Sequence, residues 1–98
     1  MDIIRVGSKS IPSSVAMILA RIASNKGEVQ TQTIGPGALN QAVKAVAIAR
    51  DMMTPDGYDV YFWPEFLDVL IDDGERTSII MTVKAVKKPQ GEPCASSS

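Results

Sequence analysis

The sequence contains no histidine and one cysteine, which excludes several classes of catalytic and metal site. Without histidine there is no Ser-His-Asp or Cys-His arrangement, and the commonest metal ligand is missing. A single cysteine, Cys94, makes neither an intrachain disulfide nor a zinc site. We therefore expect a protein that is not an enzyme and that carries no metal and no cofactor.

Long apolar runs are also lacking, and none approaches the roughly 20 residues that cross a bilayer. The N-terminus has no signal-peptide pattern. Together with the single cysteine, these absences predict a cytoplasmic protein without a membrane partner.

Charge is divided unevenly along the chain, although the net charge is only −1. Residues 3–50 hold six basic side chains and one acidic one, a balance of +5. Residues 51–76 hold eight acidic side chains and one basic one, a balance of −7. This division is typical of opposed charged faces, of a positive face that meets a negative one in a second subunit, or of ordinary solvated surfaces.

Strand and helix patterns follow one another in a simple order. We expect strands over residues 2–6, 28–34, 58–63 and 77–86, an extended segment over 66–71, and a hairpin turn over 72–75. A first helix, capped by Ser13 or Ser14, ends at Gly27, and a second runs from Ala38 to about Met53. Pro64 is expected to bend or interrupt the third strand.

The order strand, helix, strand, helix, strand, strand favours an α/β two-layer sandwich, with a mixed sheet and both helices on one face. Apolar residues at helical spacing predict the positions that are buried against that sheet. These are Val15, Ile18, Leu19, Ile22, Leu39, Val43 and Val46. We expect one domain over residues 1–86, followed by a disordered tail rich in Pro, Gly and Ser over residues 87–98.

The third strand carries aromatic side chains on both of its faces. Tyr61 and Trp63 fall on one side, whereas Tyr58, Val60 and Phe62 fall on the other. We expect one side to cover the core and the other to meet a partner, and base stacking is one option for that partner. Excess apolar surface of this kind also predicts a homodimer or a larger assembly.

Three segments resemble the stage V sporulation protein S family. They are Ile4-Arg5-Val6-Gly7-Ser8-Lys9-Ser10 with Ser14-Val15-Ala16, then Gly37-Ala38-Leu39-Asn40-Gln41-Ala42-Val43-Lys44-Ala45-Val46-Ala47-Ile48-Ala49-Arg50, and Asp72-Asp73-Gly74-Glu75-Arg76-Thr77. The resemblance covers residues 2–86. More distantly the pattern is similar to the Alba superfamily of small nucleic-acid-binding proteins, which implies an Alba-like fold. The family resemblance implies a role in developmental regulation or cell division.

The Alba resemblance places Lys9 at a position where Alba-like proteins carry a nucleic-acid-contacting lysine. The turn before the second helix matches a second contacting loop. Two departures accompany the match, because Ser8 stands in place of a second basic residue and the hairpin over residues 65–76 is acidic. The residues predicted to bind nucleic acid are Ser8, Lys9, Gly35, Gly37, Asn40, Gln41, Lys44 and Arg50.

Two hypotheses about function follow. The first is a regulator that binds DNA or RNA weakly and without sequence preference, acting as a homodimer through its positive loops. The second is a protein-interaction module that meets a protein partner through the acidic hairpin or the aromatic strand and does not bind nucleic acid.

Overall fold

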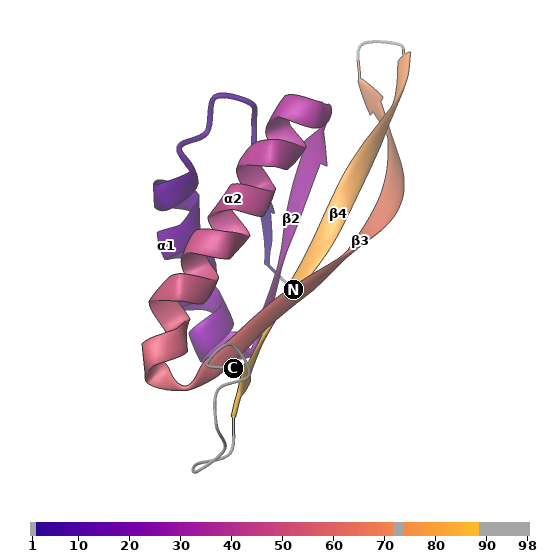
Figure 1. Ribbon diagram of the computed structural model, residues 1–98. Helices are drawn as coiled ribbons and strands as arrows, with labels where there is room; N and C mark the ends of the chain where they lie inside the picture. The colour runs from indigo at the N-terminus through magenta and orange to yellow at the C-terminus, as the bar shows by residue number, and fades with distance from the viewer. Residues whose placement is uncertain (1, 72–73, 89–98) are drawn as a thin grey trace.

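The computed structural model describes residues 2–71 and 74–88. They form a four-stranded sheet with both helices packed on one face, as predicted (Figure 1). The elements are β1 (Ile3–Arg5), α1 (Pro12–Lys26), β2 (Glu28–Ile34), α2 (Pro36–Met53), the 3-10 helix η1 (Thr54–Asp56), β3 (Tyr58–Ile71) and β4 (Gly74–Lys87). The strand order is β1-β2-β4-β3. Only β1 and β2 are parallel, and the other neighbouring pairs are antiparallel.

The helix ends follow from local chemistry, with one correction. Gly27 ends α1 in the left-handed region at φ 88°, and its N–H donates to the Ala23 carbonyl at 2.8 Å, as predicted. The predicted serine cap of α1 is wrong, because the N-cap is Ile11 and neither Ser13 nor Ser14 caps the helix. The helix begins earlier because Pro12 at its first position has the backbone angle that a helix start requires.

The core lies between the helices and the covered face of the sheet, and alanine sets its geometry. Val15, Leu19 and Val46 are buried as predicted, and Ile22 and Leu39 are partly buried against the core. The predictions for Ile18 and Val43 are wrong, because both side chains are exposed. Each helix instead turns its small side chains inward, since alanines permit close packing. They are Ala16, Ala23, Ala42, Ala45 and Ala49.

The β3–β4 hairpin is longer than the rest of the sheet. Pro64 does not interrupt β3, which corrects the prediction: it pairs with Met81 in an unbroken register. Proline is tolerated there because β3 is an edge strand, so a missing N–H is not needed for a further ladder. We call residues 65–71 and 74–77 the arm, and Figure 1 shows it projecting beyond the helices.

The two ends of the chain are only partly described. At the start, Lys26 at the end of α1 bonds Asp2 at 2.9 Å, and its hydrogen bond and charge lower the pKa of the Asp2 carboxyl. At the other end, Lys87 closes β4 and the Lys88 N–H donates to the Gly57 carbonyl at 2.8 Å. The rest of the predicted tail lies outside the described residues, as do Asp72 and Asp73 of the predicted turn.

Candidate nucleic-acid interface

The loop between β1 and α1 is a compact turn that holds Ser8 and Lys9 on its outer side. The Gly7 N–H donates to the Ser10 hydroxyl at 2.9 Å, and the Ser10 N–H donates back to the Gly7 carbonyl at 3.1 Å. These two bonds close the turn around the intervening residues. Ser8 and Lys9 are both exposed, so the lysine ammonium faces solvent.

The start of α2 packs directly against this loop. Gly35 precedes the helix at φ 89°, a conformation that glycine adopts without strain. Gly37 lies so near the loop that a Cβ there would stand 3.2 Å from the Cβ of Ser8. One turn later, the Gln41 side-chain amide donates to the Ser8 carbonyl at 3.2 Å. The loop and the helix start therefore form one surface, and a side chain at position 37 would push them apart.

This surface has the chemistry of an anion site. The first intrahelical bond runs from the Leu39 N–H to the Gly35 carbonyl at 3.1 Å, so the N–H groups of Gly37 and Ala38 precede the helical ladder. Pro36 contributes no N–H, which reduces the number of donors. The positive end of the helix dipole nevertheless favours negative charge at this point.

Two exposed side chains extend the surface along α2. Lys44 stands seven residues after Gly37, so Gly37, Gln41 and Lys44 share one flank of the helix. Asn40 is exposed one turn before Lys44. The structure thus brings together seven of the eight predicted residues, in an area that runs from Lys9 to Lys44.

Arg50 does not belong to this cluster. It lies 13 residues after Gly37, which is about 20 Å along a helix at ~1.5 Å per residue. Its Nε atom stands 3.9 Å from a carboxylate oxygen of Asp59 on β3. Arg50 therefore faces the edge strand and not the Lys9 loop.

Arg5 belongs to the same end of the molecule, although it was not among the predicted residues. It is exposed at the end of β1, and with Ser8 it lines a groove of about 410 Å³ between the loop and the arm. Val69 and Leu70 form the opposite wall of this groove. No signal in the sequence indicated this role, because the groove depends on how the arm packs beside the end of β1.

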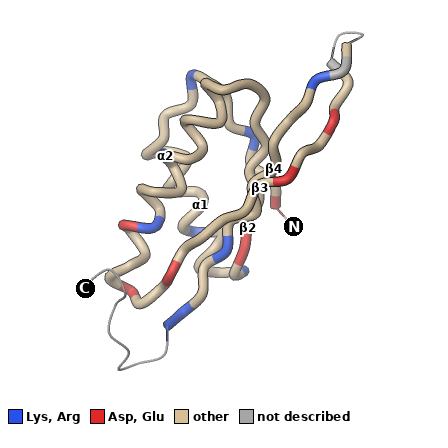
Figure 2. Tube along the Cα trace, turned by 45° about the vertical axis from the view of Figure 1, so that its right-hand side comes forward, with Lys and Arg blue, Asp and Glu red and all other residues tan. Residues whose placement is uncertain are grey.

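The arm beside this groove differs from the loop in charge and in polarity. Glu65 and Asp68 lie on β3, where Figure 2 shows acidic positions along the arm, and Arg76 lies on β4. Phe66 and Leu70 are 81% and 79% exposed, respectively. The arm is therefore an apolar, acidic ribbon next to a cationic loop.

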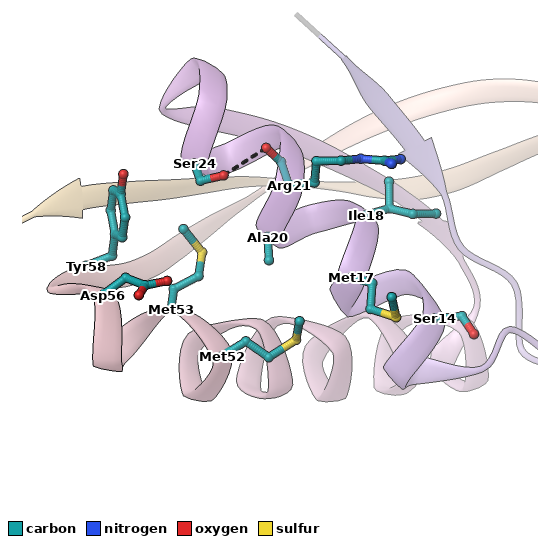
Figure 3. A pocket seen from close by; sticks show the side chains of 10 residues that line it. All are labelled: Ser14, Met17, Ile18, Ala20, Arg21, Ser24, Met52, Met53, Asp56 and Tyr58. Carbon is teal, nitrogen blue, oxygen red and sulfur yellow. Dashed lines mark hydrogen bonds between the residues drawn. The ribbon is translucent and has the colours of Figure 1, made fainter.

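A larger cavity than this groove lies elsewhere, between α1 and the end of α2 (Figure 3). It measures about 560 Å³ and is lined partly by Met17, Met52 and Met53, with Arg21 and Asp56 at its edges. None of the eight predicted residues lines it. Within residues 2–71 and 74–88, no group of three or more acidic, cysteine or histidine side chains is placed to hold a metal ion. No helix in that part of the chain has the length and apolarity of a membrane span.

Comparisons with known proteins agree with this architecture. The fold is similar to that of Alba from Thermoplasma volcanium, with a TM-score of 0.56 and 21% sequence identity. The similarity covers 85% of this chain and 99% of that one. At this identity the likeness concerns the fold, which is Alba-like. The sequence matches the family model described as Stage V sporulation protein S (SpoVS) over residues 2–86. The chain therefore belongs to the stage V sporulation protein S family.

Proposed function

We propose that the protein is a non-enzymatic developmental regulator that binds DNA or RNA weakly and without sequence preference, as a cytoplasmic homodimer. One observation carries the proposal: the close packing of Gly37 on Ser8, with the Gln41–Ser8 bond, joins the Lys9 loop to the start of α2. Lys9, Lys44 and the first N–H groups of α2 then act on the same stretch of phosphates.

The side chains on this surface favour backbone contacts over base reading. Lysines neutralise phosphates and release counterions, which gives affinity that depends on salt and not on sequence. A helix start likewise bonds phosphate oxygens and positions the nucleic acid without reading bases. With two lysines per subunit, the affinity of one chain is low, and a dimer that presents two such surfaces doubles the contacts.

The homodimer is supported by an apolar flank on the other side of α2. Leu39 and Val43 lie on the side of the helix opposite to Gln41, and a shallow cavity of about 310 Å³ separates Leu39 from Phe66 of the arm. We call Leu39, Val43 and Phe66 the apolar flank. Val43 and Phe66 are exposed and Leu39 is partly buried, and apolar surface grouped in this way favours burial against a second copy. Light scattering at tens of micromolar should give twice the mass of one chain, and the mass of a single chain would contradict the dimer.

A protein-interaction module without nucleic-acid binding is the second candidate, and the arm favours it. Its exposed Phe66 and Leu70 suit a protein partner, and the carboxylates of Glu65 and Asp68 repel phosphates. This candidate gains support if the chain shows no affinity for nucleic acid at low salt.

The test compares the affinities of two charge-reversal variants of the protein for generic duplex DNA and RNA. Lys9→Glu reverses a charge on the proposed surface, whereas Arg21→Glu makes the same change about 14 Å along α1 from its first residue, at ~1.5 Å per residue. Both variants have the same net charge, so a difference between their affinities reports where the substituted side chain lies relative to the bound nucleic acid. We expect Lys9→Glu to weaken binding about tenfold or more for every sequence tested, since a dimer loses two phosphate contacts. Equal affinities of the two variants would contradict the assignment of this loop.

A further inference from the structure

The face of the sheet opposite the helices carries an organised set of side chains that the proposed function does not use. The register places Tyr61 and Trp63 of β3 beside Lys84 and Thr82 of β4. Thr82 in turn lies beside Gln30 of β2. Both helices cover the other face, so this open face has no element packed over it among the described residues (Figure 1).

Two aromatic rings form the centre of the open face. The ring centroids of Tyr61 and Trp63 are 6.2 Å apart, with their planes inclined at 31°. The two residues are 45% and 39% exposed, so each ring is in contact with the sheet while part of it remains open. Thr82 and Ile80 are almost fully buried although no helix covers them. Neighbouring side chains on this face, including Trp63, must therefore cover Thr82 and Ile80 on β4.

A row of amides and hydroxyls continues from the rings toward β1. The Gln30 amide donates to the Thr82 hydroxyl at 3.2 Å, and the Gln32 amide donates to the Ser78 hydroxyl at 3.5 Å. These bonds fix the orientation of both glutamines. Each glutamine has a second N–H and a carbonyl oxygen in addition, which are the groups that bond the edges of nucleobases.

Cations from two other strands border the row. Lys84 lies opposite Tyr61 in the register, and Arg5 lies opposite Gln32. No basic residue stands between the aromatic residues along β3. The two cations near them come instead from neighbouring parts of the sheet, Lys84 from β4 and Arg5 from β1. Glu28 lies directly opposite Lys84 in the register, and Asp59 and Glu65 fall on the same face, so carboxylates offset the cations of this face. Affinity for a polyanion must then come mainly from stacking, with Lys84 and Arg5 as the phosphate contacts.

We propose that the open face binds single-stranded nucleic acid, with bases stacked on Tyr61 and Trp63 and phosphates near Lys84 and Arg5. Stacking on aromatic side chains with flanking cations is how single strands are held without sequence preference. A duplex does not fit this face in the same way, because its bases are already stacked on one another. The site borders the Lys9 surface at the groove that Arg5 and Gln32 line with Ser8, and it takes a different form of nucleic acid.

Trp63 provides a direct measurement because it is the only tryptophan in the sequence. Titration with oligo(dT) and oligo(U) of about ten nucleotides should quench its fluorescence saturably, since a stacked base contacts the indole. A blunt duplex at equal phosphate concentration should leave the emission nearly unchanged. Absence of quenching by single strands, or equal quenching by the duplex, would overturn the proposal.

Matched variants separate stacking from general effects. Tyr61→Leu should weaken single-strand affinity about tenfold, in line with the stacking energy of one base. Tyr58→Leu makes the same change on the helix-covered face and should leave the affinity unchanged. Circular dichroism should show both variants folded, and a Tyr61→Leu affinity equal to wild type would overturn the proposal. Lys84→Gln should reduce the salt dependence by about 0.7 in the slope for single strands.

The outcome is independent of the proposed function. Lys9→Glu should weaken duplex binding and leave the quenching of Trp63 by single strands intact. If duplex binding is present and quenching is absent, the open-face site fails and the Lys9 surface stands. If quenching is present and duplex binding is absent, the Lys9 surface fails and the open-face site stands.

Discussion

The body and the arm share strands β3 and β4, yet apolar side chains are buried in the body and exposed in the arm. By the body we mean the part of the molecule formed by the helices and the sheet that they cover. In the body, Val60 of β3 and Val83 of β4 are buried in the core beneath the helices. In the arm, Phe66 and Leu70 stand on the same strand at the same spacing and are almost fully exposed. The exposure differs because the helices cover β3 and β4 in the body and neither helix extends over the arm. A two-stranded ribbon is marginally stable alone, so the arm depends on the body for its stability and leaves apolar side chains exposed.

The same comparison holds for charge. The cationic loop with Lys9 and the acidic arm with Asp68 lie toward the same end of the molecule (Figure 1). Phosphates are attracted to the first and repelled by the second. We therefore expect a duplex that binds the proposed Lys9 surface to approach from the side of the loop and α2, with the arm as a boundary.

The largest expected effect is a difference in stability between a substitution in the body and one in the arm. Leu19 is fully buried on α1, so Leu19→Ala should lower the free energy of unfolding by about 2–5 kcal/mol. Phe66→Ala in the arm should change it by about 0.5 kcal/mol or less, because the side chain has little burial to lose. Thermal melts of both variants below the concentration at which the wild type dimerises test the contrast. Similar losses of stability in both variants would mean that the arm is covered in solution.

A second change sharpens the description of the body. The hydroxyl of Thr31 on β2 is buried with no hydrogen-bond partner in the part of the chain that the structure describes. Valine has nearly the same shape and no polar atom to desolvate, so Thr31→Val should raise the free energy of unfolding by about 1 kcal/mol. The melting temperature should then rise by roughly 4–8 °C for a domain of this size. A lower melting temperature would show that the hydroxyl has a partner.

The smallest effect concerns the charge of the arm. Glu65→Gln with Asp68→Asn removes two carboxylates per subunit, and each repels phosphates near the Lys9 surface. We expect duplex affinity to rise a few-fold at low salt, and the gain should vanish near 1 M salt, where the screening length falls to about 3 Å. The control is Asp51→Asn at the far end of α2 with Asp56→Asn in η1, which should have a smaller effect. Weaker binding by the arm variant would mean that these carboxylates are contacts.

Much of the fold was predictable because local signals agree with the tertiary structure. Gly27 ends α1 and Gly35 starts α2 with the positive φ angles that their positions require. The helix faces were not predictable to the same degree, because alanines decide the packing and carry little hydrophobic signal. The prediction that Pro64 interrupts the third strand was wrong because edge and central strands differ only in tertiary context.

The candidate sites were predictable only in part, for a related reason. The resemblance named Lys9 and the Gly35–Gly37 turn as separate loops, and the structure joins them through Ser8. Arg5 and Lys84 could not be assigned from the sequence, since their roles depend on which strands pair and in which register. Contacts between residues 8 and 37, or 61 and 84, arise from packing and leave no local pattern.

The most direct test of the account is an anisotropy titration of wild-type protein with two unrelated DNA duplexes over a range of salt. Two subunits with Lys9 and Lys44 on the surface predict equal affinities for both sequences. The logarithm of the affinity should fall linearly with the logarithm of salt, with a slope of about −2 to −4. Absence of binding at low ionic strength, or affinity for one duplex that does not change with salt, would contradict the proposed function.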